Sequence, residues 1–333
     1  MRQVALGNSG ISCGALGLGC MGMSEFYGPP QDEAVSQATL KRALELGVTL
    51  FDTSDMYGRG HNEELIGRFA RGKRDRLVIA SKFGVVRDPD GPSGSLHDRE
   101  LDNSRDYMRR TLEGSLRRLG TDVVDLYYVH RMDARRPIED TVGDLAELVQ
   151  EGKIRAIGLS EVGPEILRRA ASVHPIAALQ SEYSLFHRDV EAEVLPTCRE
   201  LGITFVPYSP LGRGFLTGAI TSAASLDAND LRQNAPRFQG ENMDRNLALL
   251  EQVKVIAAAK NCTLGQVALA WLFAQGDDIV PIPGTKRVKY LEENVGAVGI
   301  HLTPEEAGSI SAILSPENIA GSREWKAPEA APR

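Results

Sequence analysis

The sequence has no long hydrophobic run, and no stretch approaches the ~18 consecutive apolar residues that indicate a membrane-spanning helix. Gly7 and Asn8 interrupt the first residues before the apolar core of a signal peptide can form. A strongly basic segment is also missing, because 38 Lys and Arg residues stand against 45 Asp and Glu residues, for a net charge of −7. We therefore expect neither a membrane nor a nucleic acid as a partner.

Cysteine is scarce, with four residues in a chain of 333. They form no Cys-x-x-Cys pair and no cluster with histidine at the spacing of a zinc site, which argues against a disulfide scaffold and against a metal centre. Reduced thiols in a cytoplasmic protein are the expected state of these residues. The four are Cys13, Cys20, Cys198 and Cys262.

The chain is long enough for two average domains or for one large α/β barrel. A repeated pattern favours the barrel: in 43–51 and again in 198–206, an amphipathic helix ends at glycine and a short apolar strand follows. Helical periodicity is present at 32–46, 63–69, 106–119, 141–150, 164–171, 191–201 and 247–259. The strand candidates are 15–19, 48–51, 77–80, 123–129, 154–159, 176–179, 203–206 and 279–282.

Strands that alternate with helices predict right-handed βαβ units and a parallel sheet. Eight strands of nearly uniform apolar character fit a closed (β/α)8 TIM barrel better than an open sheet. We expect a β-hairpin over 4–12 that closes the bottom of the barrel, and an extra C-terminal helix from the capping sequence at Thr303 to about Leu314. Residues 1–320 are predicted to form a single domain, and 321–333 a flexible tail.

The segment from Gly17 to Gly22 matches the dinucleotide pattern G-x-G-x-x-G. That fingerprint requires a helix directly after it and an acidic residue about 20 positions on. Here Gly28-Pro29-Pro30 prevents a helix, and Asp52 lies 30 residues beyond Gly22. We therefore disfavour a Rossmann fold and expect the glycines to let a loop run close to another group at the mouth of the barrel.

Four chemically active residues follow three successive strand candidates: Asp52, Tyr57, Lys82 and His130. The carboxyl ends of barrel strands carry the chemistry in this type of fold. An ammonium beside Tyr57 would lower the pKa of its phenol, a carboxylate would hold that ammonium, and a histidine could orient a carbonyl oxygen. Each residue has a structural alternative: a surface lysine, a capping aspartate, a buried histidine, a packing tyrosine. Together they predict a tyrosine general acid for carbonyl reduction.

These residues lie in segments that resemble the aldo-keto reductases. The first is 51–58 followed by Asn62-Glu63, and further matches are 116–122, 125–130, 157–160, 180–184 and 208–214. The resemblance implies an (α/β)8 barrel that binds NADPH without a Rossmann fold. It also implies that Tyr57 is the acid, that Lys82 and Asp52 adjust its acidity, and that His130 orients the substrate carbonyl.

The same resemblance implies the cofactor contacts. Ser160 and Gln180 would bond the nicotinamide amide, Tyr208 would stack on its ring, and backbone N–H groups of a glycine-rich turn would hold the pyrophosphate. The residues of this turn are Ser209, Leu211, Gly212, Arg213 and Gly214. Glu293 and Asn294 would contact the adenine. The remaining expected cofactor contacts are Gly22, Met23 and Asp52, which follow the first two strand candidates.

One position departs from the family pattern, in which Lys-Ser and a later arginine bind the 2′-phosphate and adenine. This chain has Gly284-Thr285 and then Tyr290 at the matching positions. Lys286 and Arg287, at the start of the next helix, would supply the positive charge instead. This arrangement favours NADPH over NADH.

The leading hypothesis is an NADPH-dependent reductase of small aldehydes or ketones. A nucleotide-sensing regulatory module with little turnover is the second, and a barrel enzyme with metal-dependent chemistry is the third. The substrate pocket is expected to be walled by 26–30, 83–105 and 209–243, with the C-terminal tail as a further candidate wall. The mixed composition of these segments fits no single substrate class, and no feature favours one oligomeric state.

Overall fold

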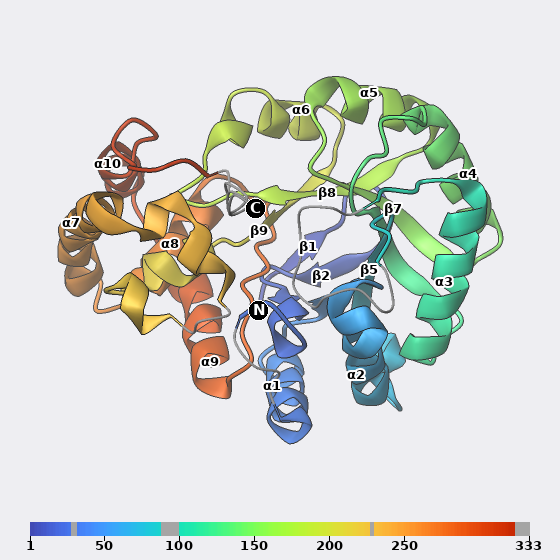
Figure 1. Cartoon of the computed structure of the whole chain (residues 1–333), viewed down its shortest axis with the longest axis horizontal. Helices are drawn as coiled ribbons and strands as arrows, with labels where there is room; N and C mark the ends of the chain where they lie inside the picture. The colour runs from blue at the N-terminus through green and yellow to red at the C-terminus, as the bar shows by residue number, and fades with distance from the viewer. Residues whose placement is uncertain (28–31, 88–99, 227–229, 324–333) are drawn as a thin grey trace, which may run out of the picture.

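A computed structural model describes residues 1–27, 32–87, 100–226 and 230–323. Seven parallel strands lie side by side in chain order, and helices surround them (Figure 1). The strands are β3 (Leu18–Gly19), β4 (Leu50–Asp52), β5 (Val78–Phe83), β6 (Val124–Val129), β7 (Ile154–Ser160), β8 (Ile176–Glu182) and β9 (Thr204–Tyr208). The predicted (β/α)8 barrel is thereby confirmed.

Helices surround the strands, and the first six of them follow the predicted periodicity, with ends shifted by a few residues. The surrounding helices are α1 (Glu33–Glu45), α2 (His61–Ala70), α3 (Arg105–Leu119), α4 (Ile138–Gln150), α5 (Pro164–Val173), α6 (Val194–Glu200), α8 (Leu264–Ala274) and α9 (Val288–Gly296). Two further helices, α7 (Gly240–Ala259) and α10 (Pro304–Ile313), lie at the left edge of the molecule in Figure 1. The predicted capping box opens α10, where Thr303 and Glu306 bond reciprocally.

The eighth barrel position is filled by residues 278–284, which form no continuous strand. On one side, the amides of Val280 and Ile282 donate to β9. On the other side, Pro281 and Pro283 accept bonds from Gly17 and Gly19, but proline has no N–H to return. The predicted strand 279–282 is therefore present only as isolated bridges that close the barrel between β9 and β3.

Gly17 and Gly19 have a packing role, which corrects our expectation for the glycine-rich segment. A Cβ at Gly17 would lie 2.8 Å from the side chain of Ile282, and one at Gly19 would lie 2.9 Å from its carbonyl oxygen. These glycines let β3 approach the eighth segment closely. The close neighbour is the barrel wall and not a group at the mouth.

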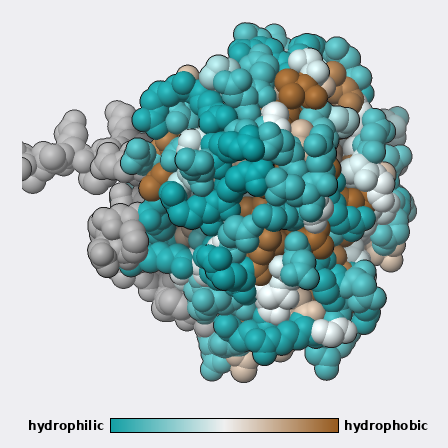
Figure 2. Space-filling view, turned by 90° about the vertical axis from the view of Figure 1, so that its right-hand side faces the viewer, coloured by the Kyte–Doolittle hydropathy of each residue, from teal (hydrophilic) through white to brown (hydrophobic). Residues whose placement is uncertain are grey.

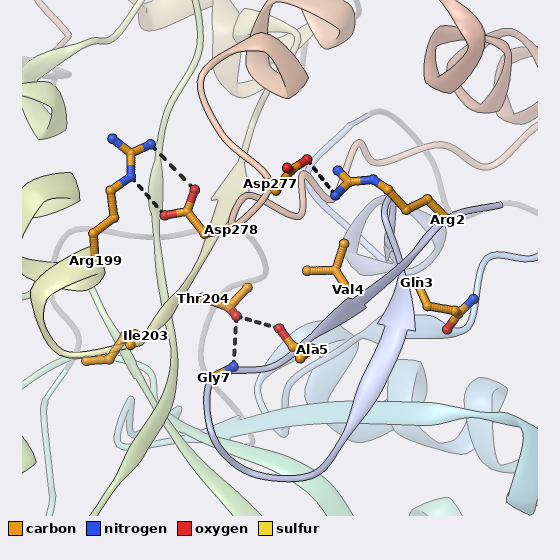
Figure 3. Close-up of a pocket in the computed structure, with 11 residues that line it drawn as sticks. Arg2, Gln3, Val4, Ala5, Gly7, Arg199, Ile203, Thr204, Asp277 and Asp278 are labelled. Atoms are coloured by element: carbon orange, nitrogen blue, oxygen red, sulfur yellow. Dashed lines mark hydrogen bonds and ion pairs between the residues drawn. The ribbon is translucent and has the colours of Figure 1, made fainter.

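The N-terminal hairpin closes the bottom of the barrel. Its strands, β1 (Gln3–Ala5) and β2 (Ser12–Gly14), pair antiparallel, and Leu6 and Ile11 pack with the inward-facing side chains of the barrel strands. Thr204 fixes the hairpin to β9, because its hydroxyl donates to the carbonyl of Ala5 and accepts from the amide of Gly7 (Figure 3). The predicted hairpin and its place in the barrel are thereby confirmed.

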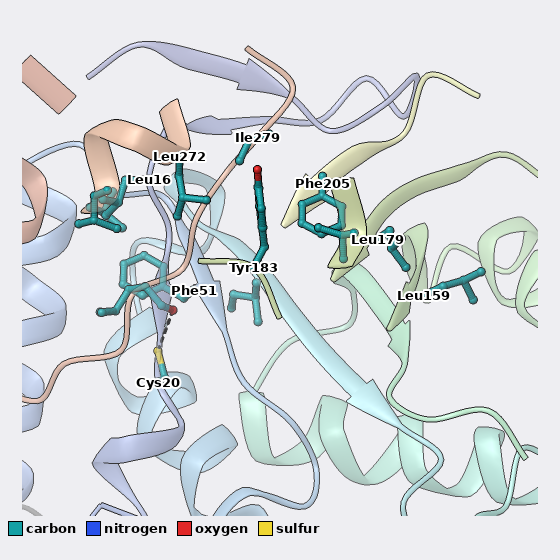
Figure 4. Packing of buried hydrophobic residues seen from close by; sticks show 14 of the residues in the cluster. Leu16, Cys20, Phe51, Leu159, Leu179, Tyr183, Phe205, Leu272 and Ile279 are labelled. Atoms are coloured by element: carbon teal, nitrogen blue, oxygen red, sulfur yellow. Dashed lines mark hydrogen bonds between the residues drawn. The ribbon is translucent and has the colours of Figure 1, made fainter. Parts of the chain in front are cut away.

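A second apolar layer lies between the strands and the helices. In it Tyr183 lies between Phe205 and Leu272 (Figure 4). Leu272 belongs to α8, a helix that the sequence pattern does not reveal. Eight of its eleven residues are buried, so α8 has no polar face and no amphipathic period to detect.

The side of the molecule over α3 and α4 is mostly hydrophilic, with hydrophobic residues in small separate patches (Figure 2). Ion pairs join these two helices, including Arg105 with Asp144 and Arg109 with Glu151. In the described residues no single helix is long and apolar enough to cross a membrane; α7 and α8 pass that test only as a pair bent by 83°.

Candidate active site

The carboxyl ends of β4 and β5 bring Asp52, Tyr57 and Lys82 together. The Lys82 ammonium donates to Asp52 Oδ1 at 2.6 Å, to the Thr53 carbonyl at 2.9 Å and to the Tyr57 hydroxyl at 3.3 Å. Lys82 is completely buried, so these three oxygens replace the water that its charge would otherwise bind. The ammonium is held at one point, beside the phenol.

Burial decides the pKa of Tyr57. Removal from water raises the pKa of the phenol above its ordinary value, and the nearby Lys82 only partly opposes that rise. Our expectation of a lowered pKa was therefore wrong for the free protein, because sequence spacing shows the lysine but not the depth of the site. For Lys82, burial disfavours the charged form, but Asp52 and Tyr57 outweigh it and raise the pKa of the ammonium.

A tight turn carries Tyr57 from the end of β4 to the start of α2. Gly58, Arg59 and Gly60 all have positive φ, of 55°, 57° and 90°. Such backbone angles suit the two glycines and are uncommon for arginine. The turn therefore depends on support from its surroundings.

That support comes from Asn62 and Glu63, the polar pair of the family-like segment. Asn62 is fully buried, accepts from the hydroxyl of Thr53 at 2.6 Å and donates to the carbonyl of Cys20. Glu63 is also fully buried, accepts from Ser81 and pairs with Arg118 at 2.7 Å. These contacts fasten α2 to the strand ends on both sides and so hold the turn in place.

His130 follows β6 and faces Tyr57. The two rings lie edge to face with centroids 5.8 Å apart, and the hydroxyl of Ser54 lies 3.3 Å from His130 Nδ1. The next residue, Arg131, donates to the Ser160 hydroxyl at 3.0 Å, and its positive charge acts on Tyr57. The sequence alone assigns no role to Arg131.

The residues predicted to contact the nicotinamide stand on neighbouring strands. Ser160 on β7 pairs in register with Gln180 on β8, and both are buried. The amide nitrogen of Gln180 donates to Asp52 Oδ2 at 2.7 Å, which links this pair to the lysine. Tyr208 ends β9 in register with Glu182. These three side chains lie on adjacent strands at the carboxyl-end rim of the barrel, and they offer hydrogen-bonding groups for a nicotinamide amide and an aromatic face for its ring.

The predicted pyrophosphate turn follows β9 directly. Its residues Ser209, Gly212, Arg213 and Gly214 have positive φ. The amides of Gly212 and Gly214 donate to the carbonyls of Ser209 and Leu211, so two of the expected anion donors close the turn itself. Arg213 is held 3.0 Å from Glu182.

The remaining cofactor candidates lie around β3 and α9. Gly284 bridges to Gly19, and Thr285 accepts from the amide of Arg287. Lys286 donates to the carbonyl of Tyr27 at 2.9 Å, and burial together with the charge of Arg287 lowers its pKa. Glu293 accepts a hydrogen bond from the Thr263 hydroxyl at 2.7 Å. Asn294 and Met23 are buried, and Met23 shares a short 3-10 helix with Gly22.

A cluster that sequence reasoning missed joins the chain's C-terminal segment to this rim. Arg323 lies 3.1 Å from Glu161, 3.1 Å from Glu182 and 3.3 Å from the hydroxyl of Tyr208. The sequence predicts a flexible tail over 321–333, of which 324–333 lies outside the described residues. No local pattern marks Arg323, because its partners are more than 100 positions away in the chain.

The predicted pocket walls are described in part. The segments 28–31, 88–99 and 227–229 lie outside the described residues. The described part of 209–243 contains a series of short 3-10 helices and the start of α7. Among the described residues, no three His, Cys, Asp or Glu side chains gather as metal ligands would.

A parallel barrel with a buried lysine, aspartate and tyrosine at its strand ends places the chain among the α/β-barrel proteins, whose active sites lie at this end of the strands. Residues 15–315 match the aldo/keto reductase family. The chain belongs to this family and is therefore an oxidoreductase.

Individual relatives agree with this assignment. The chain is 49% identical to the aldo-keto reductase yakc of Schizosaccharomyces pombe, which is named with NADP(+), over 93% of this chain and 91% of that protein. A glycerol dehydrogenase of Gluconobacter oxydans is similar in structure, with a TM-score of 0.85 and 28% identity over 98% of this chain and 99% of that one. The holo form of an aldo-keto reductase from Bacillus halodurans is also similar in structure, with a TM-score of 0.77 and 26% identity over 97% of this chain and 99% of that one.

Proposed function

We propose that the protein reduces small aldehydes or ketones to alcohols with NADPH and that Tyr57 is the general acid. The supporting observation is the buried ammonium of Lys82, which contacts both Asp52 and the Tyr57 hydroxyl. The raised pKa keeps the phenol protonated at neutral pH, so Tyr57 holds a proton to donate. The ammonium 3.3 Å away then stabilises the phenolate that remains.

The other residues position these two groups. Gln180 and Lys82 each occupy one oxygen of the Asp52 carboxylate, which fixes the carboxylate on both sides. His130 lies against the ring of Tyr57, where an imidazole N–H can donate to the same carbonyl oxygen that receives the proton. Two donors on one oxygen orient the carbonyl and favour the transition state, in which that oxygen becomes negative.

The rim of the barrel supports NADPH as the cofactor. When bound, NADPH supplies the hydride that adds to the carbonyl carbon. Ser160, Gln180 and Tyr208 offer the hydrogen-bonding groups and the aromatic face that a nicotinamide requires. Lys286 and Arg287 are two like charges close enough that one lowers the pKa of the other, and a 2′-phosphate would relieve this repulsion. The name of the Schizosaccharomyces pombe relative points the same way.

A reducing cytoplasm is the proposed location, which the four cysteines support because all are free thiols. The proposed partner is a small carbonyl compound. We expect no role for a metal ion, because Tyr57 and His130 supply the groups that would polarise the carbonyl.

Tyr57→Phe tests the proposal. The change removes the proton donor and keeps the ring, so NADPH affinity should stay near that of wild type while the rate falls by about 10²–10⁴-fold. Single-turnover oxidation of NADPH by a reactive aldehyde measures the rate, and fluorescence quenching measures affinity. The matched control is Tyr127→Phe, at a buried tyrosine of β6 whose hydroxyl has no hydrogen-bond partner among the described residues, and it should behave as wild type.

Two results would contradict the proposal. A Tyr57→Phe enzyme that reduces the aldehyde at the wild-type rate would exclude the tyrosine acid. A wild-type protein that binds NADPH tightly but reduces no carbonyl compound in a broad panel would favour the nucleotide-sensing function.

A further inference from the structure

A second cavity, of about 360 Å³, lies between the turn that carries Tyr57 and helix α3. Its size is within the range of small-molecule sites, which is ~300–1,000 Å³. None of Tyr57, Lys82 and His130 lines it, so it is separate from the proposed active site. Its charged lining residues are Arg59, Arg87, Arg110, Arg117, Arg118 and Asp55.

The positive charge of this cavity exceeds its negative charge. Arg87 pairs with Glu25 at 2.8 Å, and Arg118 pairs with Glu63 at 2.7 Å. Arg110 lies over the ring of Tyr107, and no carboxylate of the described residues is within ion-pair distance of Arg110 or Arg117. Like charges gathered around one cavity repel one another, and an anion would remove that cost.

The acidic residue in the lining opposes this charge only weakly. Burial, joined by the negative charge of Glu63, raises the pKa of Asp55 to about 7. The Ser54 hydroxyl donates to Asp55 Oδ1 at 2.9 Å, and Arg118 also acts to stabilise the carboxylate, but neither outweighs the burial. Asp55 therefore keeps its proton more readily than an exposed aspartate, and the arginines that line the cavity set the sign of its charge.

We propose that this cavity binds a small organic anion that carries a phosphate or a carboxylate group. Guanidinium groups recognise both through paired N–H···O bonds. Arg59 belongs to the turn of Tyr57, whereas Arg110 and Arg117 belong to α3, so one anion contacts both elements at once. Arg118 already packs on the same turn, since a Cβ at Gly60 would lie 2.6 Å from its Cδ.

The test is calorimetric titration of the protein saturated with NADP⁺, so that the cofactor's own anion sites are filled. The probes are propyl phosphate, malonate and uncharged propionamide, which separate a phosphate from a carboxylate and both from a neutral molecule. We expect saturable binding of at least one anion and none of propionamide. Arg110→Gln combined with Arg117→Gln should weaken that binding by tenfold or more, as expected when charge-assisted hydrogen bonds are lost.

The matched control is Arg71→Gln combined with Arg76→Gln. These exposed arginines lie between α2 and the start of β5, at the opposite end of the barrel strands, and should leave binding unchanged. Arg117→Gln alone, on an exposed side chain, is the second variant if the double change lowers the melting temperature.

Two outcomes would overturn the proposal. One is the absence of saturable binding of both anions up to about 10 mM. The other is equal binding by wild type and the Arg110/Arg117 variants, which would place the anion elsewhere. Because the titration needs no turnover, a failure of the proposed reductase activity would leave this result intact.

Discussion

Lys82→Met would leave Asp52 as a buried carboxylate without its ammonium partner. The two side chains are 0% and 5% exposed and lie 2.6 Å apart. After the change, the amide of Gln180 would be the remaining side-chain donor to Asp52 that the structure shows. Removing one partner of a buried ion pair costs about 3–5 kcal/mol, because the other charge stays buried. We expect the free energy of unfolding to fall by about that amount, and turnover to fall by at least about 10²-fold.

A second change separates the structural cost from the catalytic one. Lys82→Met combined with Asp52→Asn buries no charge, so the double variant should lose less stability than the sum of the single variants, by about 2–3 kcal/mol. It should nevertheless remain inactive, because Tyr57 has lost the ammonium that lies within hydrogen-bond distance of its hydroxyl. A stable but inactive double variant would show that the lysine serves the reaction as well as the fold.

Urea unfolding followed by circular dichroism at pH 7 measures stability, and single-turnover NADPH oxidation measures activity. The control is Lys153→Met, because Lys153 pairs with Glu113 at 2.5 Å on the surface, where the side chains are 36% and 45% exposed. Exposed pairs contribute about 0–1 kcal/mol. The reasoning would be refuted if Lys82→Met unfolded at the same urea concentration as wild type, or if the costs of the two buried changes simply added.

Three further predictions concern single positions. Lys286→Ala should weaken NADPH binding by about 1–3 kcal/mol and leave NADH binding nearly unchanged. An equal loss of affinity for both cofactors would show that Lys286 does not bind the 2′-phosphate. Tyr208→Ala should weaken cofactor binding and slow turnover, whereas Tyr208→Phe should lose only the 3.3 Å contact with Arg323; full activity of the alanine variant would place the nicotinamide elsewhere. Between pH ~4, the pKa of an unfolded aspartate, and about 7, the folded state alone holds a proton on Asp55, so its contribution to stability falls as pH rises. Asp55→Asn should remove this slope and raise the free energy of unfolding at pH 8 by about 1–3 kcal/mol, and an unchanged pH profile in urea unfolding would contradict the shift.

The hydrophobic periodicity of the sequence and its helix-capping residues predict most of the fold. Helix α3 is predictable because it begins after the cap at Ser104 and ends at Gly120 with a left-handed backbone. Strands such as β6 are predictable because they are buried on both faces and therefore apolar throughout. Helix α8 and the broken eighth strand escape the same method. Helix α8 has no polar face. In the eighth strand, Pro281 and Pro283 face the β3 side, where they cannot donate hydrogen bonds, and the sequence does not show which neighbouring strand each residue faces.

The residue types of the candidate site are also visible in the sequence, since Asp52, Tyr57, Lys82 and His130 each stand at or shortly after the carboxyl end of a strand. Parallel strands that close into a barrel bring their carboxyl ends to one rim, so succession in the chain becomes proximity in space. The family resemblance strengthens that prediction. It does not supply the pKa of Tyr57, because the sign of the shift depends on how much water the folded chain excludes.

Only the tertiary structure decides the long-range partners. Arg323 meets Tyr208 across 115 positions, and Gln180 meets Asp52 across 128. Arginines from the Tyr57 turn and from α3 line one cavity, although no local sequence pattern links the two segments. The local sequence pattern indicates which face of a segment is apolar and therefore buried. The charges that surround a site, and the water it excludes, depend on segments far apart in the chain, and only the closed barrel brings those segments together.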